Sequence, residues 1–353
     1  MVLFVVDGGK EKGYGHVVRT TVLARACVER GLDVSFACTN EDVVKAIRSR
    51  GEGFHVYAVP PKELIHHTLA VYPHVLVADA DKTFTAEEVR VLHQAGIFLI
   101  EWDATNGTSH ADEVINGFEP ALYGAKGHRY KLTGRDYFVV DELFSETKSV
   151  RGKAGPAKKL WRLFLCFGGS DPGGLLEATL EHMQEIPECL AATIHAIAGF
   201  NEAKGRAVAN RFSKLTGLHV HVNADAARVS QLMGSSDLGI VSFGSILVEA
   251  LCTELPVFVI NPTRAHEQYA AKVLAGIFAG AGRSFGCPPR VRWEAFREEL
   301  GAIMGEPQRI APLQSAARGL VDGKGARRIA EHIYTLVARR PPRHSRFQHS
   351  VAR

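Results

Sequence analysis

The side chain best suited to moving protons near neutral pH is His16, in the segment Gly13-Tyr14-Gly15-His16. Two glycines allow the backbone to approach a ligand closely, and an imidazole has an unperturbed pKa of about 6.5. Arg19 follows about one helical turn later and could meet an anion or a carboxylate. A plainer interpretation is that His16 only caps a helix while Arg19 pairs with a surface acid. The segment is therefore a candidate for base catalysis.

A second segment is rich in glycine and follows a strongly apolar run. It contains Gly168, Gly169, Ser170 and Asp171, and it leads into residues 175–183, whose apolar positions recur at helical spacing. A strand that passes through glycines into a helix leaves free N–H groups at the positive end of the helix dipole, where phosphates bind. The alternative is a tight strand-to-helix turn without a ligand.

A third segment has the same strand-to-helix character. Ser242, Gly244 and Ser245 follow an apolar run, and Glu249 stands about one turn into the next helical stretch. Ser245 could cap the helix or bind phosphate, and the Glu249 carboxylate could accept both hydroxyls of a ribose. The alternative is an ordinary cap followed by a first-turn acid, both of which helices favour.

Two further polar positions complete the set of candidates. Gln268, in the loop and helix start 262–268, could bond a sugar or phosphate, or it could belong to a simple polar turn. Asp79 and Asp81 form the D-x-D pair of the chain, which we interpret as carboxylates at a sheet end with some prospect of touching substrate. Neither H-x-x-x-H nor D-x-D stands beside the glycines, so we expect no metal and no cofactor.

These candidates must be positioned by short apolar strands that alternate with amphipathic helices. That alternation is typical of parallel sheets covered on both faces, and its repetition predicts an α/β protein with two Rossmann-like domains facing a cleft. The expected strands are residues 2–6, 33–38, 54–59, 74–78, 96–100, 161–167, 192–196, 218–222, 238–241 and 256–260. The expected helices are residues 17–30, 41–50, 87–95, 175–183, 226–233, 245–253 and 313–339.

A change in composition suggests where the domains divide. We expect an N-terminal domain over 1–148, a linker over 149–159, a C-terminal domain with its closing helices over 160–338 and a disordered basic tail over 339–353. The tail accounts for much of the mild net charge of +4, which does not favour nucleic-acid binding.

Composition and cysteine usage indicate a soluble protein of the cytoplasm. Hydrophobic residues make up 46% of the chain and charged residues 23%, and no stretch approaches the roughly 18 apolar residues of a membrane span. The six cysteines form no C-x-x-C pair, so we expect them to be reduced and buried. The first apolar run lacks a basic region before it and predicts a strand rather than a signal peptide. The oligomeric state is left open, with a monomer as the simplest case.

Taken together, the motifs resemble the UDP-2,4-diacetamido-2,4,6-trideoxy-altropyranose hydrolase family of pseudaminic acid synthesis and related spore-coat polysaccharide proteins. The resemblance spans roughly residues 1–335. It is carried by G-x-G-H-x-x-R with Val22-Leu23-Ala24, by Ala111-Asp112 with Ile115-Asn116 and Tyr123-Gly124, by Phe167 to Pro172, and by Val321 to Ala326. The family has the GT-B fold and is similar to the peptidoglycan N-acetylglucosaminyltransferase.

The resemblance implies a UDP-sugar as the partner and divides the candidates between the two domains. It implies that the C-terminal domain binds UDP and that the N-terminal domain holds the sugar, with His16 as the base that activates water. The candidates on the sugar side are Gly13, Gly15, Arg19, Asp79, Asp103, Asn116 and Tyr123. Those on the nucleotide side are Gly168, Gly169, Ser170, Asp171, Ser242, Gly244, Ser245, Glu249 and Gln268.

The chain departs from the family pattern at two places that bear on its activity. Ile100-Glu101-Trp102-Asp103 stands where the family has Ile-Asp-Asp, and Val139-Val140-Asp141 stands where it has Leu-Leu-Arg. The leading hypothesis is a hydrolase that cleaves the anomeric C–O bond of a UDP-linked acetamido sugar and releases UDP. A glycosyltransferase that uses the same donor, and a nucleotide-sugar-binding protein without turnover, are the alternatives.

Overall fold

The computed structural model describes most of the chain, and each expected strand, and each expected helix before residue 313, has a counterpart in it. The described residues are 1–9, 13–80, 82–103, 109–118, 130–147, 160–169, 171, 173–199 and 202–339. Tyr123, Ser170, the expected linker and residues 340–353 of the expected tail lie outside them.

In the described part of the chain, the N-terminal half is built on a seven-stranded sheet whose paired strands are all parallel. The strand order is β3-β2-β1-β4-β5-β6-β7. β1, β2 and β4 are buried at every position, which is why they read as continuous apolar runs in the sequence. The strands are β1 (Val2–Val6), β2 (Val34–Cys38), β3 (His55–Ala58), β4 (Val75–Asp79), β5 (Phe98–Trp102), β6 (Glu113–Asn116) and β7 (Tyr130–Thr133).

Helices pack against this sheet and begin at recognisable signals in the sequence. Asn40 accepts a hydrogen bond from the Val43 backbone and caps α2, while Thr85 and Glu88 form a reciprocal capping box at α4. The helices of this half are α1 (Gly15–Glu29), α2 (Glu41–Arg48), α3 (Leu64–Val71), α4 (Ala86–Gln94) and α6 (Glu142–Glu146), with 3-10 turns η1 (Pro61–Glu63) and η2 (Arg135–Tyr137).

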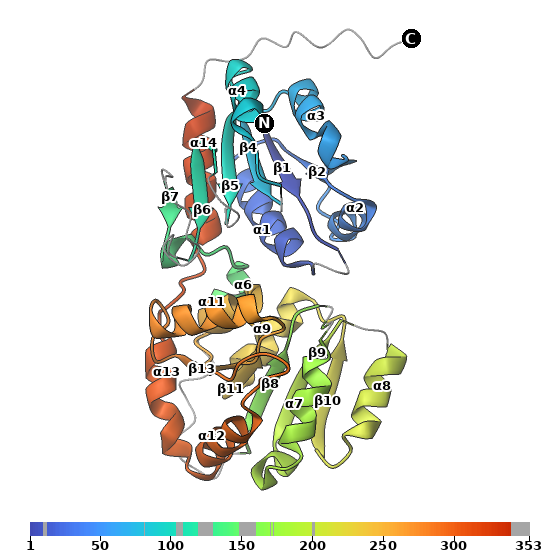
Figure 1. Cartoon of the computed structure of the whole chain (residues 1–353), viewed down its shortest axis with the longest axis vertical. Coiled ribbons are helices and arrows are strands. Elements are labelled where there is room, and N and C mark those ends of the chain that lie inside the picture. Colours follow the sequence, from blue (N-terminus) through green and yellow to red (C-terminus); the bar gives the residue numbers. More distant parts are fainter. Residues whose placement is uncertain are drawn as a thin grey trace.

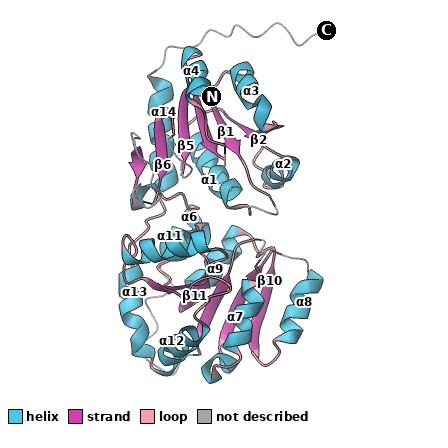
Figure 2. Cartoon of the chain, in the orientation of Figure 1, coloured by secondary structure: helices cyan, strands magenta, loops and turns pink. Residues whose placement is uncertain are grey.

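The C-terminal half repeats the plan with a six-stranded parallel sheet of order β10-β9-β8-β11-β12-β13. Figure 2 shows the two sheets with helices around them. The strands are β8 (Arg162–Cys166), β9 (Thr193–Ala198), β10 (Gly217–Val222), β11 (Leu238–Val241), β12 (Val257–Val259) and β13 (Gly282–Ser284). The helices are α7 (Leu175–Met183), α8 (Glu202–Arg211), α9 (Ala226–Ser235), α10 (Ser245–Cys252), α11 (Arg264–Ala275), α12 (Trp293–Gly305) and α13 (Ala311–Ala317), with η4 (Pro187–Ala191) and η5 (Pro307–Ile310).

The strand order contains one reversal point in each sheet. The winding direction reverses between two central strands, β1 and β4 in the first sheet and β8 and β11 in the second. Ligands of open parallel sheets bind outside the carboxyl ends of the strands at such reversals. The segments beginning at Gly13, Gly168 and Ser242 follow β1, β8 and β11, so all three lie at these reversal points.

The last helix returns to the first domain. α14 (Gly325–Ala338) contacts α1, and its residues Ala326, Ile329, Ala330 and Ile333 belong to the same core cluster as β1 and β4. Figure 1 shows it beside the first sheet. The interrupted helix expected over 313–339 within the second domain is therefore two helices: α13 stays in that domain, and α14 crosses to the first.

An aromatic cluster joins the two halves. Phe118 and Phe138 of the first half pack against Phe243 and Phe278 of the second, with ring centroids 5.0 Å apart for Phe118 and Phe243 and 5.6 Å apart for Phe138 and Phe278. These residues share one buried cluster with β11, β12 and α10. The connection between the domains is therefore a packed apolar contact.

Some elements of the structure were not expected from the sequence. They include the strands β6, β7 and β13, which have three or four residues each and so carry little periodicity, and the helices α3, α6, α8 and α12. The six cysteines are free and buried, which confirms that expectation. No helix in the described ranges is long and apolar enough to cross a membrane.

Candidate functional site

A histidine and a carboxylate meet at the reversal of the first sheet. His16 lies in the first turn of α1, directly after β1, and Asp79 is the last residue of β4. The His16 Nδ1 atom lies 2.5 Å from Asp79 Oδ1. The Asp79 side chain is 1% exposed and that of His16 is 36% exposed, so the carboxylate is buried behind a ring that reaches solvent.

This arrangement fixes the protonation pattern of the ring. A buried carboxylate beside Nδ1 favours the tautomer that carries its proton there, which leaves Nε2 as the proton acceptor. Nε2 is the ring nitrogen that does not contact Asp79. The same division of roles orients the histidine in hydrolytic triads.

Arg19 holds two carboxylates together behind His16. Its Nε atom donates to Asp79 Oδ2 at 2.6 Å, and its two terminal nitrogens donate to Asp79 Oδ1 and Asp103 Oδ2, each at 2.5 Å. The guanidinium also lies over the Trp102 ring, 4.8 Å from its centroid. Arg19 is therefore engaged by the protein itself, in keeping with the expectation that it meets a carboxylate.

The charges in this cluster shift the pKa values in opposite directions. Burial would raise the pKa of the Asp79 carboxyl, but Arg19 and His16 outweigh it and lower that pKa to about 2. Burial raises the pKa of the Asp103 carboxyl; Arg19 lowers it, but the combined effect of burial and the nearby Asp79 charge is larger. Asp79 is thus ionised throughout the neutral range and available to support a protonated His16.

The remaining sugar-side candidates are placed differently. Asp103 has a left-handed backbone, with φ of 46°, at the end of β5, a conformation that non-glycine residues rarely adopt outside special sites. Asn116, the last residue of β6, is buried, and its Oδ1 atom has no hydrogen-bond partner within the part of the chain that the structure describes. Gly13 and Gly15 flank the approach to His16, and Tyr123 lies outside the described residues.

The glycine segment after β8 is in close contact with the loop that follows β9. A Cβ atom added to Gly199, just beyond β9, would lie 1.3 Å from the carbonyl oxygen of Gly169, so only glycine allows these two loops to meet. The Asp171 carboxylate accepts hydrogen bonds from the backbone of Leu175 at 2.9 Å and Leu176 at 3.0 Å. Asp171 thus caps α7, and its carboxylate occupies two backbone N–H groups that were candidates for binding phosphate.

The start of α10 has no such cap. Gly244 is its N-cap residue, with φ of 136°, and among the described residues no side chain accepts a hydrogen bond from its first turn. Ser242 is buried, Ser245 is half-buried at the helix start, and a Cβ added to Gly15 would lie 3.2 Å from Ser245 Oγ. The helix start with uncapped donors therefore lies directly beside the loop that carries His16.

Glu249 lies one turn into α10 as a half-buried residue. Burial raises the pKa of its carboxyl to about 7, with a smaller contribution from the negative charge of Asp141. Asp141 itself is paired with Arg25, whose terminal nitrogen lies 2.7 Å from Asp141 Oδ2. Among the described residues no side chain is bonded to the Glu249 carboxylate. Gln268, by contrast, is exposed on α11.

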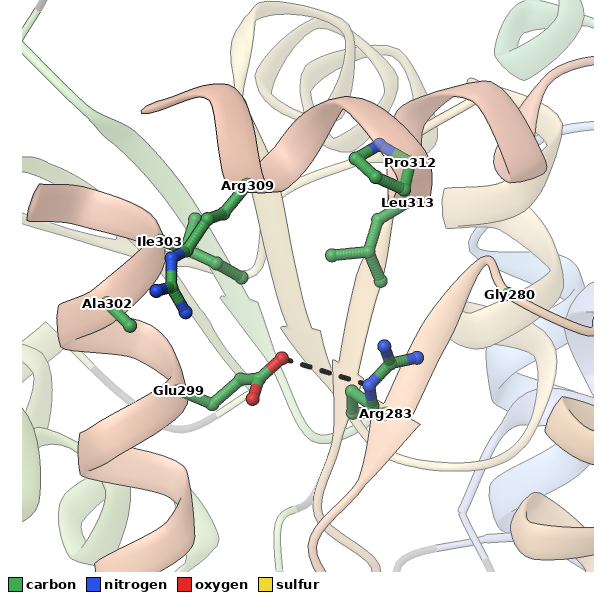
Figure 3. Close-up of a pocket in the computed structure, with 8 residues that line it drawn as sticks. All are labelled: Gly280, Arg283, Glu299, Ala302, Ile303, Arg309, Pro312 and Leu313. Atoms are coloured by element: carbon green, nitrogen blue, oxygen red, sulfur yellow. Dashed lines mark ion pairs between the residues drawn. The ribbon is translucent and has the colours of Figure 1, made fainter. Parts of the chain in front are cut away.

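A cavity of about 380 Å³ lies elsewhere in the second domain. It is formed between α12, η5, α13 and the edge strand β13, and Figure 3 shows Arg283 and Glu299 facing each other across it, with Arg283 Nε 3.8 Å from Glu299 Oε1. None of its lining residues was a candidate from the sequence. Within the described ranges, no group of three or more His, Cys, Asp or Glu residues is arranged to hold a metal ion.

Three residues that contact the candidate segments were not predicted from the sequence. Trp102 lies under the Arg19 guanidinium, Gly199 packs against Gly169, and Asn261 accepts a hydrogen bond from the Phe243 backbone. Each stands just beyond or at the end of a strand, so systematic inspection of strand ends would have found them. The pairing of Asp79 with His16 could also have been proposed, because β1 and β4 flank the reversal of a doubly wound sheet.

Two doubly wound parallel-sheet domains with their strand ends turned toward each other define the GT-B fold, and the chain has that fold. MurG from Acinetobacter baumannii superposes with a TM-score of 0.62 at 13% identity, covering 96% of this chain and 99% of MurG. The spinosyn forosaminyltransferase SpnP gives a TM-score of 0.65 at 15% identity, with coverages of 96% and 99%. At these identities the likeness concerns the fold.

Curated relatives are similar in sequence over most of the chain. The spore coat polysaccharide biosynthesis protein SpsG of Bacillus subtilis is 26% identical over 349 residues, covering 94% of this chain and 96% of SpsG. The UDP-2,4-diacetamido-2,4,6-trideoxy-beta-L-altropyranose hydrolase of Campylobacter jejuni is 25% identical over 265 residues, covering 71% of this chain and 87% of the hydrolase. No family model matches the chain.

Proposed function

We propose that this protein is a nucleotide-sugar hydrolase that cleaves the anomeric C–O bond of a UDP-linked acetamido-deoxy sugar during surface polysaccharide or nonulosonic acid synthesis. The observation that carries the proposal is the His16–Asp79 pair beside the uncapped start of α10. One domain then supplies a base and the other supplies donors for an anion, where Gly15 and Ser245 come close together.

In this proposal His16 Nε2 accepts a proton from water as the water oxygen bonds to the anomeric carbon. The bond between that carbon and the diphosphate oxygen breaks, and its electron pair leaves with UDP. Asp79 stabilises the imidazolium that forms, because it is ionised and bonded to Nδ1. A positioned base of this kind contributes roughly 10²- to 10⁴-fold to the rate.

The C-terminal domain binds the leaving group in the same scheme. The first-turn N–H groups of α10 face the negative charge that develops on the diphosphate, with Ser242, Gly244 and Ser245 around them. The Glu249 carboxylate accepts hydrogen bonds from the ribose hydroxyls. Gly168 and Gly169 line the neighbouring loop, while Asp171 keeps that loop in place through its cap on α7.

The similarity to the Campylobacter jejuni hydrolase supports water as the acceptor. A glycosyltransferase is the second candidate, because the same donor site would serve if an alcohol replaced water, and the Bacillus subtilis relative covers more of the chain and is named for polysaccharide synthesis. In that case His16 would deprotonate the acceptor hydroxyl.

Release of UDP from a panel of UDP-linked acetamido sugars, with and without alcohol acceptors, tests the proposal. We expect free sugar and UDP in equal amounts without any acceptor. Turnover only when an acceptor is added would favour the glycosyltransferase. Binding of UDP-sugars without turnover under either condition would contradict an enzymatic role.

A further inference from the structure

A buried amide holds the loop that leads into α10. Asn261 follows β12 and is 0% exposed, and its Oδ1 atom accepts a hydrogen bond from the Phe243 backbone N–H at 3.2 Å. Phe243 stands between Ser242 and Gly244, in the loop whose geometry sets the direction of the first N–H groups of α10. Asn261 therefore contacts the backbone of a loop in the proposed nucleotide site without being part of that loop.

The other side of the same amide reaches the next loop. Its Nδ2 atom donates to Ser284 Oγ and to the Gly286 carbonyl, both at 3.4 Å, and the Asn261 backbone N–H donates to the same carbonyl at 2.9 Å. Only the amide oxygen can accept from Phe243 and only its nitrogen can donate to a carbonyl, so the amide has one orientation. Asn261 links the segments that follow β11, β12 and β13.

The side chain of Phe243 does not fix its own backbone. The ring packs on Phe118 and Tyr269, with centroids 5.0 Å and 5.8 Å away, and these contacts hold the ring but leave the direction of the N–H open. We propose that Asn261 is a positioning residue of the nucleotide site, which aligns the Phe243 backbone so that the α10 donors face the diphosphate. This inference rests on the proposed function.

The test compares Asn261→Leu, which removes both the acceptor and the donors, with Asn261→Asp, which keeps the acceptor for Phe243. Amide hydrogen exchange reports the loop directly, and calorimetry with UDP reports the site. For Asn261→Leu we expect faster exchange at Phe243 and UDP binding weakened by about tenfold or more, because a buried donor loses its partner. Asn261→Asp should keep Phe243 protected.

Leu300→Ala is the matched control. Leu300 is fully buried in α12 of the same domain, so this substitution should destabilise the domain without removing a contact to the loop. An Asn261→Leu variant with wild-type UDP affinity, or with no greater loss than Leu300→Ala, overturns the inference. If the wild-type protein binds no UDP, the proposed function fails, and hydrogen exchange then decides this inference alone: unchanged exchange at Phe243 in Asn261→Leu overturns it.

Discussion

At the scale of single residues, the site depends on how a few charges are buried together. Asp79 is bonded to both His16 and Arg19, so one carboxylate orients the proposed base and is itself held by a guanidinium. Asp103 completes the cluster on the other side of Arg19. The two carboxylates therefore have different roles: Asp79 is hydrogen-bonded to the imidazole and to Arg19, whereas Asp103 is hydrogen-bonded to Arg19.

Replacing Asp79 by Asn should slow turnover by about 10² or more while UDP affinity stays nearly unchanged, because the imidazole loses its charged partner and its fixed tautomer. Steady-state kinetics and calorimetry measure the two effects. His16→Asn should behave similarly, and the double variant should be no slower than either single one, since the two residues act as a unit.

His93→Asn provides the control for this series. His93 pairs with Asp112 at 2.9 Å in the same domain, outside the candidate site, so its loss should leave the rate at the wild-type value. Rates that fall additively in the His16 and Asp79 double variant would speak against a coupled pair.

Glu249 should make nucleotide binding depend on pH. Its raised pKa of about 7 means that the carboxyl is neutral below that pH and charged above it. Because ribose hydroxyls donate better to a carboxylate than to a carboxylic acid, affinity for a UDP-sugar should rise as pH increases through about 7. Calorimetry across this range measures the trend, and Glu249→Gln should abolish it. A pH dependence that survives in Glu249→Gln would assign the titration to another group.

At the scale of elements, glycines and helix ends decide where ligands can approach. The loops after β8 and β9 touch through Gly169 and Gly199, and Asp171 closes the start of α7, whereas α10 begins without a side-chain cap. Two helix starts that look alike in the sequence therefore differ in the donors they can offer.

Gly199→Ala should displace the Gly169 loop, since the added methyl group would overlap a backbone carbonyl. We expect a loss of about 1–3 kcal/mol in the free energy of unfolding, together with weaker UDP binding. Urea denaturation and calorimetry measure both. Gly173→Ala is the control, because a Cβ there meets only ordinary contact with Leu175 at 3.8 Å. Equal effects in the two variants would contradict the steric argument.

α14 should stabilise the first domain although it follows the second in sequence. Ile333→Ala, at a fully buried position, should lower the free energy of unfolding by about 2–5 kcal/mol and speed hydrogen exchange in α1 rather than in β8. Tyr334→Ala, on the exposed side of the helix, should change little. Faster exchange confined to the second domain would show that the helix does not support the first.

At the scale of the whole molecule, the two domains meet where the loop that carries His16, the proposed base, lies beside the start of α10. Their contact combines the aromatic cluster around Phe118 with the approach of Gly15 to Ser245. A substrate that bridges His16 and α10 must enter at this contact. Separation of Gly15 from Ser245 should therefore control the access of substrate to the proposed site.

Gly15→Cys combined with Ser245→Cys should therefore form a disulfide under oxidising conditions, because the added Cβ would lie 3.2 Å from the present Ser245 Oγ. The six native cysteines are buried and should not compete. Non-reducing electrophoresis detects the bond, and we expect oxidation to block turnover and reduction to restore it, relative to each single variant. A crosslinked protein with full activity would show that substrate does not enter here.

The sequence by itself determined the local features of this protein. Apolar runs of about five residues, helical periodicity and caps such as Asn40 and Thr85 depend on neighbouring residues, so the alternating elements and the three candidate loops were predictable. The same pattern places His16 and Ser245 in segments that follow a strand and Asp79 at the end of a strand. Short strands such as β13 carry too little pattern to be found in this way.

Only the tertiary structure decided which of these features act together. His16 and Asp79 are 63 residues apart, and their contact depends on β1 pairing with β4 rather than on any local preference. The crossing of α14 to the first domain and the use of Asp171 as a cap depend likewise on packing between distant segments. Such contacts form because apolar segments far apart in the sequence are buried against one another. The order of neighbouring residues does not specify which distant segments will meet.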